Sequence, residues 1–145
     1  MMTAEQAYEF ALLVLCIWRE ARGESTAAQH AVAWVIKNRV GRGGWFGSGW
    51  AGCILKPWQF SSFNGPDGNG HVDSNALKFP LPQSDPAYGS CLMAAKHVYE
   101  GSVPDPTGGA TYYFDDSLAA NPPSWGKEFV ATVKIGKLNF FKDKA

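Results

Sequence analysis

The sequence has no excess of charge, few cysteines and few histidines. Thirteen basic and thirteen acidic residues give a formal net charge of zero over 145 residues. No long-range field therefore attracts nucleic acid, and we expect no nucleic-acid partner. The three cysteines are odd in number and far apart, and the three histidines form no ligand motif. We therefore expect no disulfide framework, no metal and no cofactor.

The chain also lacks a long apolar run. Residues 10–18, FALLVLCIW, are far fewer than a bilayer-spanning helix needs, so we expect no stable membrane insertion. A signal peptide is not expected either, because Glu5 and Glu9 precede the run without a Lys or Arg, and no small-residue cleavage site precedes the pair Arg19 and Glu20. We expect a protein that is cytoplasmic until it is released to the cell wall.

What the chain does have is enough length for one well-packed domain. We expect a single catalytic domain over residues 1–145, because a chain of this length can bury a core without staples. Aromatic residues make up 14% of the chain, and six of them are Trp. Many lie in glycine-rich segments, where they can be core residues or can line a groove that stacks on sugar rings.

Apolar periodicity predicts three main helices, over residues 3–21, 26–40 and 85–100. The first is apolar nearly all round, which is typical of a central, buried helix. Thr26 followed by Gln29 predicts a capping box at the start of the second helix. Only a short corner separates the first two of these helices.

The rest of the chain is mostly irregular. We predict a mobile glycine-rich loop over residues 41–52, a short helix over 51–56 and a long irregular segment over 57–83. A turn leads to a strand within 105–114, and 128–141 is typical of a hairpin. The fold class is therefore α+β, mainly helical, with a small antiparallel β element.

Glu20 is the candidate catalytic residue. It follows Ile17 by three residues and Cys16 by four, so it continues an apolar helix face. Burial and the helix C-terminus both disfavour the carboxylate and raise its pKa. A glutamic acid that is protonated near neutral pH can donate a proton to a glycosidic oxygen. The same position equally suits a solvated helix end, or an ion pair with Arg19 or Arg22, which would lower the pKa.

A set of motifs resembles the cell wall hydrolase family typified by the spore-cortex lytic enzyme SleB. REARGES at residues 19–25 is followed by AAQHAVAWVIKNRV at 27–40. QFS at 59–61, DPTGGATYYF at 105–114 and the TVKIG stretch at 132–136 follow in the order of that family. The matches span nearly the whole chain.

This resemblance implies a lysozyme-like fold and a single catalytic glutamate, Glu20, in a groove between the helical part and the β part. Such enzymes cut the bond between N-acetylmuramic acid and N-acetylglucosamine in peptidoglycan glycan strands, the expected partner. Glu20 would protonate the leaving oxygen and then accept the proton of the muramyl C6 hydroxyl, giving a 1,6-anhydro end. No second carboxylate is needed. We expect a monomeric endolysin, encoded by a phage or prophage.

Other residues are candidates for substrate binding or support. QFS would offer an amide, a ring and a hydroxyl to a sugar, or it is a loop packed by Trp58 and Phe60. Trp125 is a sugar platform or a core plug, and alternation on the strand puts Tyr112 and Phe114 on the face opposite Tyr113. The candidates for substrate binding are Gln59, Phe60, Ser61, Tyr112, Tyr113 and Trp125, with Glu24, Gly108 and Gly109 in supporting roles.

The sequence departs from the family at two positions. Leu138 stands where a His is expected, and Arg19 replaces a small residue before the glutamate. Three other functions stay open. They are a hydrolytic muramidase that uses water at the same site, an amidase or cysteine peptidase, and a glycan-binding module without catalysis.

Overall fold

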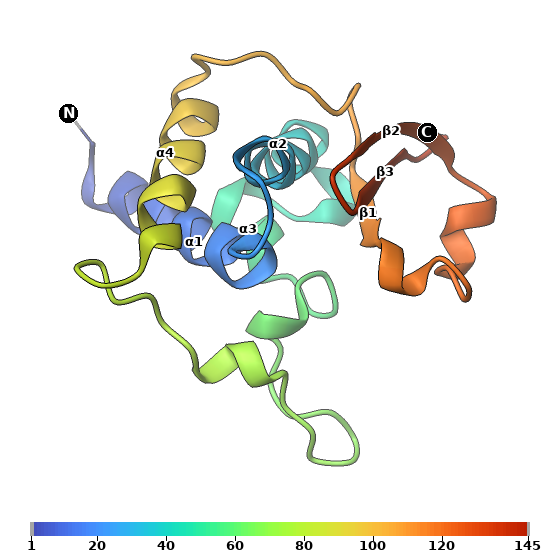
Figure 1. Cartoon of the computed structure of the whole chain (residues 1–145), viewed down its shortest axis with the longest axis horizontal. Helices are drawn as coiled ribbons and strands as arrows, with labels where there is room; N and C mark the ends of the chain where they lie inside the picture. Colours follow the sequence, from blue (N-terminus) through green and yellow to red (C-terminus); the bar gives the residue numbers. More distant parts are fainter. Residues whose placement is uncertain (1, 145) are drawn as a thin grey trace.

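A computed structural model of the chain describes residues 2–144. Four α-helices form one part of the molecule and a three-stranded sheet packs beside them (Figure 1). The helices are α1 (Ala4–Ala21), α2 (Thr26–Arg42), α3 (Gly49–Ile54) and α4 (Pro86–Glu100), and the strands are β1 (Tyr112–Asp115), β2 (Val130–Ile135) and β3 (Leu138–Lys142). Short 3-10 helices are η1 (Gly44–Phe46), η2 (Ser61–Phe63), η3 (Ser74–Leu77), η4 (Asp116–Leu118) and η5 (Ser124–Lys127). The predicted α+β class is confirmed.

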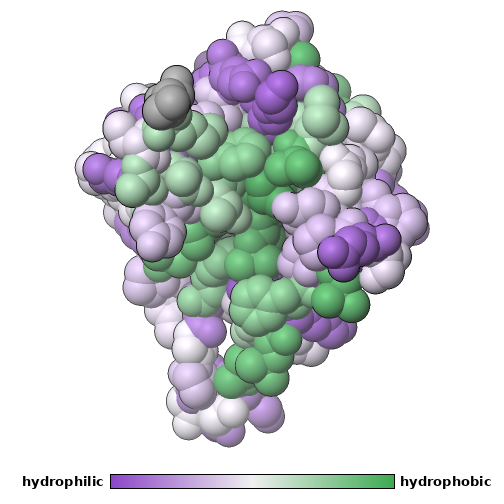
Figure 2. Space-filling view, turned by 90° about the vertical axis from the view of Figure 1, so that its left-hand side faces the viewer, coloured by the Kyte–Doolittle hydropathy of each residue, from purple (hydrophilic) through white to green (hydrophobic). Residues whose placement is uncertain are grey.

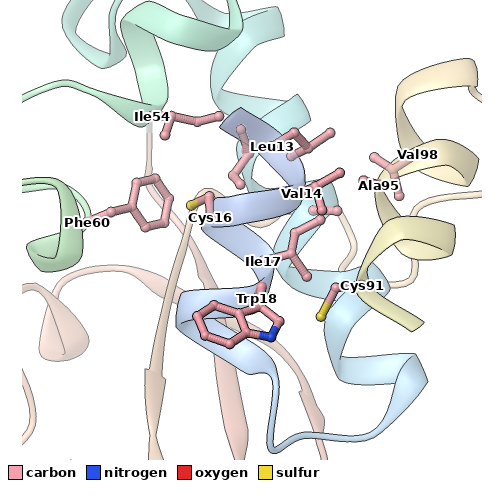
Figure 3. Close-up of a cluster of buried hydrophobic side chains, with 12 residues drawn as sticks. Leu13, Val14, Cys16, Ile17, Trp18, Ile54, Phe60, Cys91, Ala95 and Val98 are labelled. Atoms are coloured by element: carbon pink, nitrogen blue, oxygen red, sulfur yellow. The ribbon is translucent and has the colours of Figure 1, made fainter. Parts of the chain in front are cut away.

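Helix α1 is central, as predicted. Its first turn is closed by a capping box, in which Thr3 and Gln6 each accept a hydrogen bond from the backbone N–H of the other. The first half is exposed, whereas Leu13, Cys16 and Ile17 in the second half have no exposed surface. Figure 3 shows this half between side chains of α4 on one side and the ring of Phe60 on the other.

The corner between α1 and α2 differs from the prediction in one detail. Ser25, not Thr26, caps α2, because its hydroxyl accepts the N–H of Ala28 at 3.2 Å. The predicted capping box of Thr26 and Gln29 is therefore wrong. The buried Gln29 amide instead donates to the carbonyls of Ala21 and Glu24, at 3.2 and 3.3 Å. These bonds hold the end of α1 against the start of α2.

The glycine-rich segment after α2, which was predicted to be a mobile loop, contains helical structure. It contains η1 and the first residues of α3, which begins two residues earlier than predicted. Gly47 has a φ of 111°, and a Cβ there would lie 2.7 Å from the carbonyl oxygen of Gly52. Only glycine allows this close backbone approach, which sets the start of α3.

Helix α4 begins and ends where predicted. Asp85 caps it by accepting the N–H of Ala87 at 2.9 Å, Pro86 occupies the first turn, and Gly101 ends it in the left-handed region. The other carboxylate oxygen of Asp85 accepts the indole N–H of Trp18 at 2.7 Å. This bond fixes the start of α4 to α1.

The sheet is antiparallel, in the order β1-β3-β2, and β2 and β3 form the predicted hairpin. Gly136 forms the turn with a φ of 60°. One face of the sheet covers α2 through a second core cluster, which contains Val32 and Val35 from α2 and Leu138 and Phe140 from β3. Glu20 lies in the last turn of α1, next to the short corner that leads into α2.

Apolar side chains also reach the surface. Figure 2 shows a band of apolar residues down the side of the molecule on which α4 and the start of α1 lie in Figure 1. The most exposed large apolar side chains after η2 are Leu77, Phe79 and Leu81, at 83%, 64% and 68%. Within residues 2–144, no helix combines the length and apolar character needed to cross a membrane.

Candidate active site

Glu20 and Tyr113 meet where the helices and the sheet face each other. The Tyr113 hydroxyl on β1 donates a hydrogen bond of 2.8 Å to Oε1 of Glu20, across 93 residues of sequence. The Tyr113 ring packs against Phe140 of β3, with the ring centres 5.7 Å apart. Burial and the nearby Glu20 carboxylate raise the pKa of Tyr113 well above its ordinary value. The phenol therefore stays neutral and remains a hydrogen-bond donor.

The environment of Glu20 favours its protonated form. Burial is the largest cause and raises the pKa of Glu20 above its ordinary value. The Tyr113 hydrogen bond opposes this, the nearby Asp73 carboxylate raises the pKa further, and the Arg39 guanidinium lowers it. The net shift is upward, as the position of Glu20 on an apolar helix face predicts. An acid of this kind can deliver a proton at a pH where an ordinary glutamate is ionised.

The two neighbouring arginines do not pair with Glu20. Arg19 donates to the backbone carbonyls of Ser62, Ala76 and Lys78, at 3.1, 3.1 and 3.3 Å, and its guanidinium lies over two phenylalanine rings. Arg22 donates to Oδ1 of Asn75 at 2.7 Å. The ion pair with Arg19 or Arg22, which would lower the pKa, is therefore absent among the described residues. Both arginines hold the segment from η2 to η3 against the end of α1.

Arg39 on α2 is a buried cation near Glu20. It is 4% exposed, its Nε donates to the carbonyl of Thr111 at 2.7 Å, and its guanidinium lies 5.2 Å from the ring centres of Phe60 and Tyr112. Burial lowers the pKa of Arg39. Its ordinary pKa is so high that it stays charged. It therefore offers a fixed positive charge to a carboxylate at Glu20.

A hollow of about 400 Å³ opens in the irregular segment beside this site. It is lined by Trp58, Ser61, Asn64, Gly65, Asp67, His71, Val72 and Asp73. Glu20 is not among the lining residues. Asp73 connects the two places, because it lines the hollow and its charge also acts on Glu20.

Asp73 is a second carboxylate that the sequence did not reveal. The Ser61 hydroxyl donates to one of its oxygens, and the backbone N–H of Asn75 donates to the other at 2.8 Å. These hydrogen bonds, that of Ser61 first, hold the pKa of Asp73 below its ordinary value. The only sequence signal was an Asp before SN, typical of a helix cap.

The predicted QFS motif is divided by the structure. Phe60 is 2% exposed and lies in the core, so the prediction that its ring contacts a sugar is wrong. Ser61 is exposed in the hollow, and Gln59 is half-buried. Trp58, expected to pack the loop, is 71% exposed and has a φ of 68°, which is unusual for a residue with a side chain.

The predicted alternation along β1 is confirmed. Tyr113 faces Glu20, whereas Tyr112 and Phe114 both contact Trp125 on the other side of the strand. Trp125 is half-buried and also stacks with Phe129, with the ring centres 5.7 Å apart. Tyr112 and Trp125 thus belong to an aromatic cluster on the sheet face opposite Tyr113.

The two glycines of DPTGGA belong to a braced turn. Gly108 and Gly109 have φ values of 67° and 84°. The Asp105 carboxylate accepts the backbone N–H groups of Thr107 and Gly109, at 2.7 and 2.9 Å, and the Asn38 amide at 3.0 Å. The turn therefore ties the segment that leads into β1, the strand that carries Tyr113, to α2.

Glu24 and Leu138 are two further positions that the sequence singled out. Glu24 lies at the corner between α1 and α2, where its backbone carbonyl accepts a bond from Gln29 and its carboxylate approaches the Gly136 turn. Leu138 is 3% exposed and fills the second core cluster. A polar side chain at this position would face apolar neighbours.

Comparison with known proteins gives a consistent result. A family model described as Cell Wall Hydrolase matches residues 23–141. The chain is similar to the catalytic domain of the germination-specific lytic transglycosylase SleB from Bacillus anthracis, with 28% identity, a TM-score of 0.67 and coverage of 92% of this chain and 93% of that one. It is also similar to the catalytic domain of SleB from Bacillus cereus, with 29% identity, a TM-score of 0.63 and coverage of 92% and 89%. No curated protein matches the chain significantly. The matched range of the family model begins after Glu20.

Proposed function

The chain belongs to the cell wall hydrolase family, and on that premise we propose that it is a peptidoglycan lytic transglycosylase with Glu20 as its acid and base. The observation that carries this proposal is the hydrogen-bonded contact between Glu20 and Tyr113 at the junction of helices and sheet. Burial raises the pKa of Glu20, which favours the protonated form that bond cleavage requires.

In the first step, Glu20 gives its proton to the oxygen that joins N-acetylmuramic acid to N-acetylglucosamine. The bond between this oxygen and C1 of the muramyl ring breaks, and the N-acetylglucosamine side leaves with a hydroxyl group. Positive charge develops on the muramyl ring as the bond lengthens. Tyr113 holds Oε1 of Glu20 in place, which leaves Oε2 free to face the substrate.

In the second step, the carboxylate of Glu20 accepts the proton of the C6 hydroxyl on the same muramyl ring. The C6 oxygen bonds to C1 and closes a 1,6-anhydro ring, and Glu20 is protonated again for the next cycle. Arg39 and the Tyr113 hydroxyl stabilise the carboxylate between the two steps, since both lower the pKa of Glu20. One residue can therefore serve as acid and then as base.

The hollow beside Glu20 is our candidate for holding part of the glycan strand. Trp58 presents an exposed indole at its rim, and Ser61, whose side chain carries a hydroxyl, is also exposed there. Indole faces suit the apolar faces of sugar rings, and a left-handed backbone at a bulky residue is a strain that functional sites often carry.

The test combines one substitution with product analysis. Glu20→Gln should fold and lose at least about a hundredfold in the rate of peptidoglycan cleavage, because the acid is removed. Glu24→Gln is the matched control, since it changes the other glutamate of the same motif and should keep most of the activity. Mass spectrometry should find products one water lighter than reducing ends. A folded Glu20→Gln variant that still clears peptidoglycan would refute the assignment.

We also propose that the enzyme acts as an endolysin, encoded by a phage or prophage and held in the cytoplasm until the membrane is breached. The apolar run of residues 10–18 is consistent with this proposal, because its second half is core structure of α1. Induced cells should lyse only when a pore-forming protein is co-expressed. Active enzyme in the medium of intact cells without a pore would contradict the proposal.

A further inference from the structure

The segment that carries Asp73 is fixed against the end of α1. Arg19, the residue before Glu20, donates to the carbonyls of Ser62 and Ala76, both at 3.1 Å. Arg22 donates to the side chain of Asn75 at 2.7 Å. These contacts attach η2 and η3 to the helix turn that bears Glu20. Asp73, which caps η3, therefore belongs to a segment that these contacts fix near Glu20.

The Asp73 carboxylate is held in its ionised form without a salt bridge. Its two oxygens accept hydrogen bonds from the Ser61 hydroxyl and the Asn75 backbone, and it forms no ion pair with a cation of residues 2–144, although the charges of Arg19 and Lys78 also lower its pKa. The two neutral donors thus stabilise the negative charge more than these cations do. Such a carboxylate keeps its negative field available to a ligand in the hollow that it lines.

The other titratable groups around the two carboxylates do not compete for Asp73. In the hollow, His71 approaches Asp67 at 3.7 Å. On the other side of Glu20, Tyr113 belongs to β1 and Arg39 to α2, and Arg39 is directed at the carbonyl of Thr111. Glu20 and Asp73 are both half-buried, but burial is the main cause of the raised pKa of Glu20, whereas hydrogen bonds are the main cause of the lowered pKa of Asp73.

We propose that Asp73 is a second catalytic carboxylate, which faces the reacting muramyl ring from the hollow and stabilises the positive charge that develops on it when the glycosidic bond breaks. The proposal rests on the proposed function, because that charge arises only when a glycosidic bond is cut. Glycosidases commonly divide such roles between a protonated acid and an ionised partner. No bond to Asp73 forms, and no proton passes through it.

The decisive variant is Asp73→Asn, which keeps size and shape and remains a good helix cap. We expect kcat to fall at least about tenfold, with KM within about twofold, because only the charge in the transition state is lost. The basic limb of the pH profile reports proton loss from Glu20. It should move to lower pH, because the charge that raises the pKa of Glu20 is gone.

Two further variants separate charge from structure. Ser61→Ala keeps the charge but removes a hydrogen bond that lowers the pKa of Asp73, so the acidic limb should move to higher pH. Asp116→Asn removes a carboxylate that Lys134 and Asn139 contact near the end of β1, and it should change neither limb. If Asp73→Asn lowers thermal stability, the shift of the acidic limb in Ser61→Ala decides the question.

Several outcomes would overturn the proposal. Asp73→Asn with wild-type kcat and an unchanged pH profile would show that the charge is not used. A rise in KM alone would make Asp73 a binding residue only. If Glu20→Gln is inactive and Asp73→Asn is unaffected, only this inference fails. If Glu20→Gln stays active, the proposed function fails as well.

Discussion

Phe60 offers a direct test of how the irregular segment is built. The ring is 2% exposed and packs with the buried residues of α1, α3 and α4. The Arg39 guanidinium lies 5.2 Å from its centre. We predict that Phe60→Ala destabilises the protein and leaves substrate binding by the folded enzyme unchanged. The opposite interpretation, a ring that stacks on sugar, predicts the reverse.

The expected magnitude follows from the packing. Truncating a buried Phe to Ala costs about 3–5 kcal/mol, and the lost contact with Arg39 adds about 0.5–1 kcal/mol. A chain of 145 residues has an unfolding entropy of about 0.3 kcal/mol/K, from about 2.1 cal/mol/K per residue. A loss of about 4 kcal/mol therefore lowers Tm by about 13 °C.

The assay is calorimetry together with initial rates on peptidoglycan well below the melting range. Trp58→Ala is the matched control, because Trp58 is an aromatic residue of the same segment but is 71% exposed. It should change stability by less than about 0.5 kcal/mol and raise KM. A Phe60→Ala variant with Tm within about 3 °C of the wild type and weakened substrate binding would refute this account of the segment.

Three further predictions follow from the site. Tyr113→Phe removes a hydrogen bond that lowers the pKa of Glu20, so the basic limb of the activity profile should move to higher pH; an unmoved limb would argue against the contact. The pKa of Glu20 is higher in the folded protein than in the unfolded chain, so ionisation of Glu20 destabilises the folded state. This cost is absent below the unfolded-state pKa and grows as pH rises from that value through the folded-state pKa. Calorimetry should therefore find Glu20→Gln more stable than wild type on the alkaline side only. Asp105→Ala leaves the bound N–H groups of the turn without an acceptor and should lower the free energy of unfolding by about 2–4 kcal/mol in a denaturant titration; a value below about 0.5 kcal/mol would exclude the brace.

The helices and the hairpin could be predicted because their signals are local. Asp85 and Pro86 begin α4 and Gly101 ends it, as the cap residues indicate. The predicted capping box at Thr26 failed for a tertiary reason. Ser25 can cap equally well, and the corner uses the Gln29 amide to hold α1 against α2.

The site was predictable only in part. The position of Glu20 on an apolar helix face predicted a raised pKa, and strand alternation separated Tyr113 from its neighbours. Asp73 and Arg39 could not be found in this way. Asp73 comes near Glu20 because Arg19 and Arg22 bind the irregular segment, largely through backbone carbonyls, and no side-chain pattern encodes those contacts.

The same limit explains Phe60 and Trp58. Both are aromatic residues in one short segment, and composition gives no reason to bury one and expose the other. The path of the chain between α3 and η2 decides this, since it directs Phe60 into the core beside α1. Trp58 is left at the rim of the hollow with a left-handed backbone.

The most direct test of the central claim is the mass of the products formed by the wild-type enzyme in water enriched in heavy oxygen. We predict muramyl ends that are one water lighter than reducing ends and contain no heavy oxygen, and we predict that Glu20→Gln forms them at least about a hundredfold more slowly. Reducing ends that carry one heavy oxygen would contradict the transglycosylase mechanism and identify water as the nucleophile.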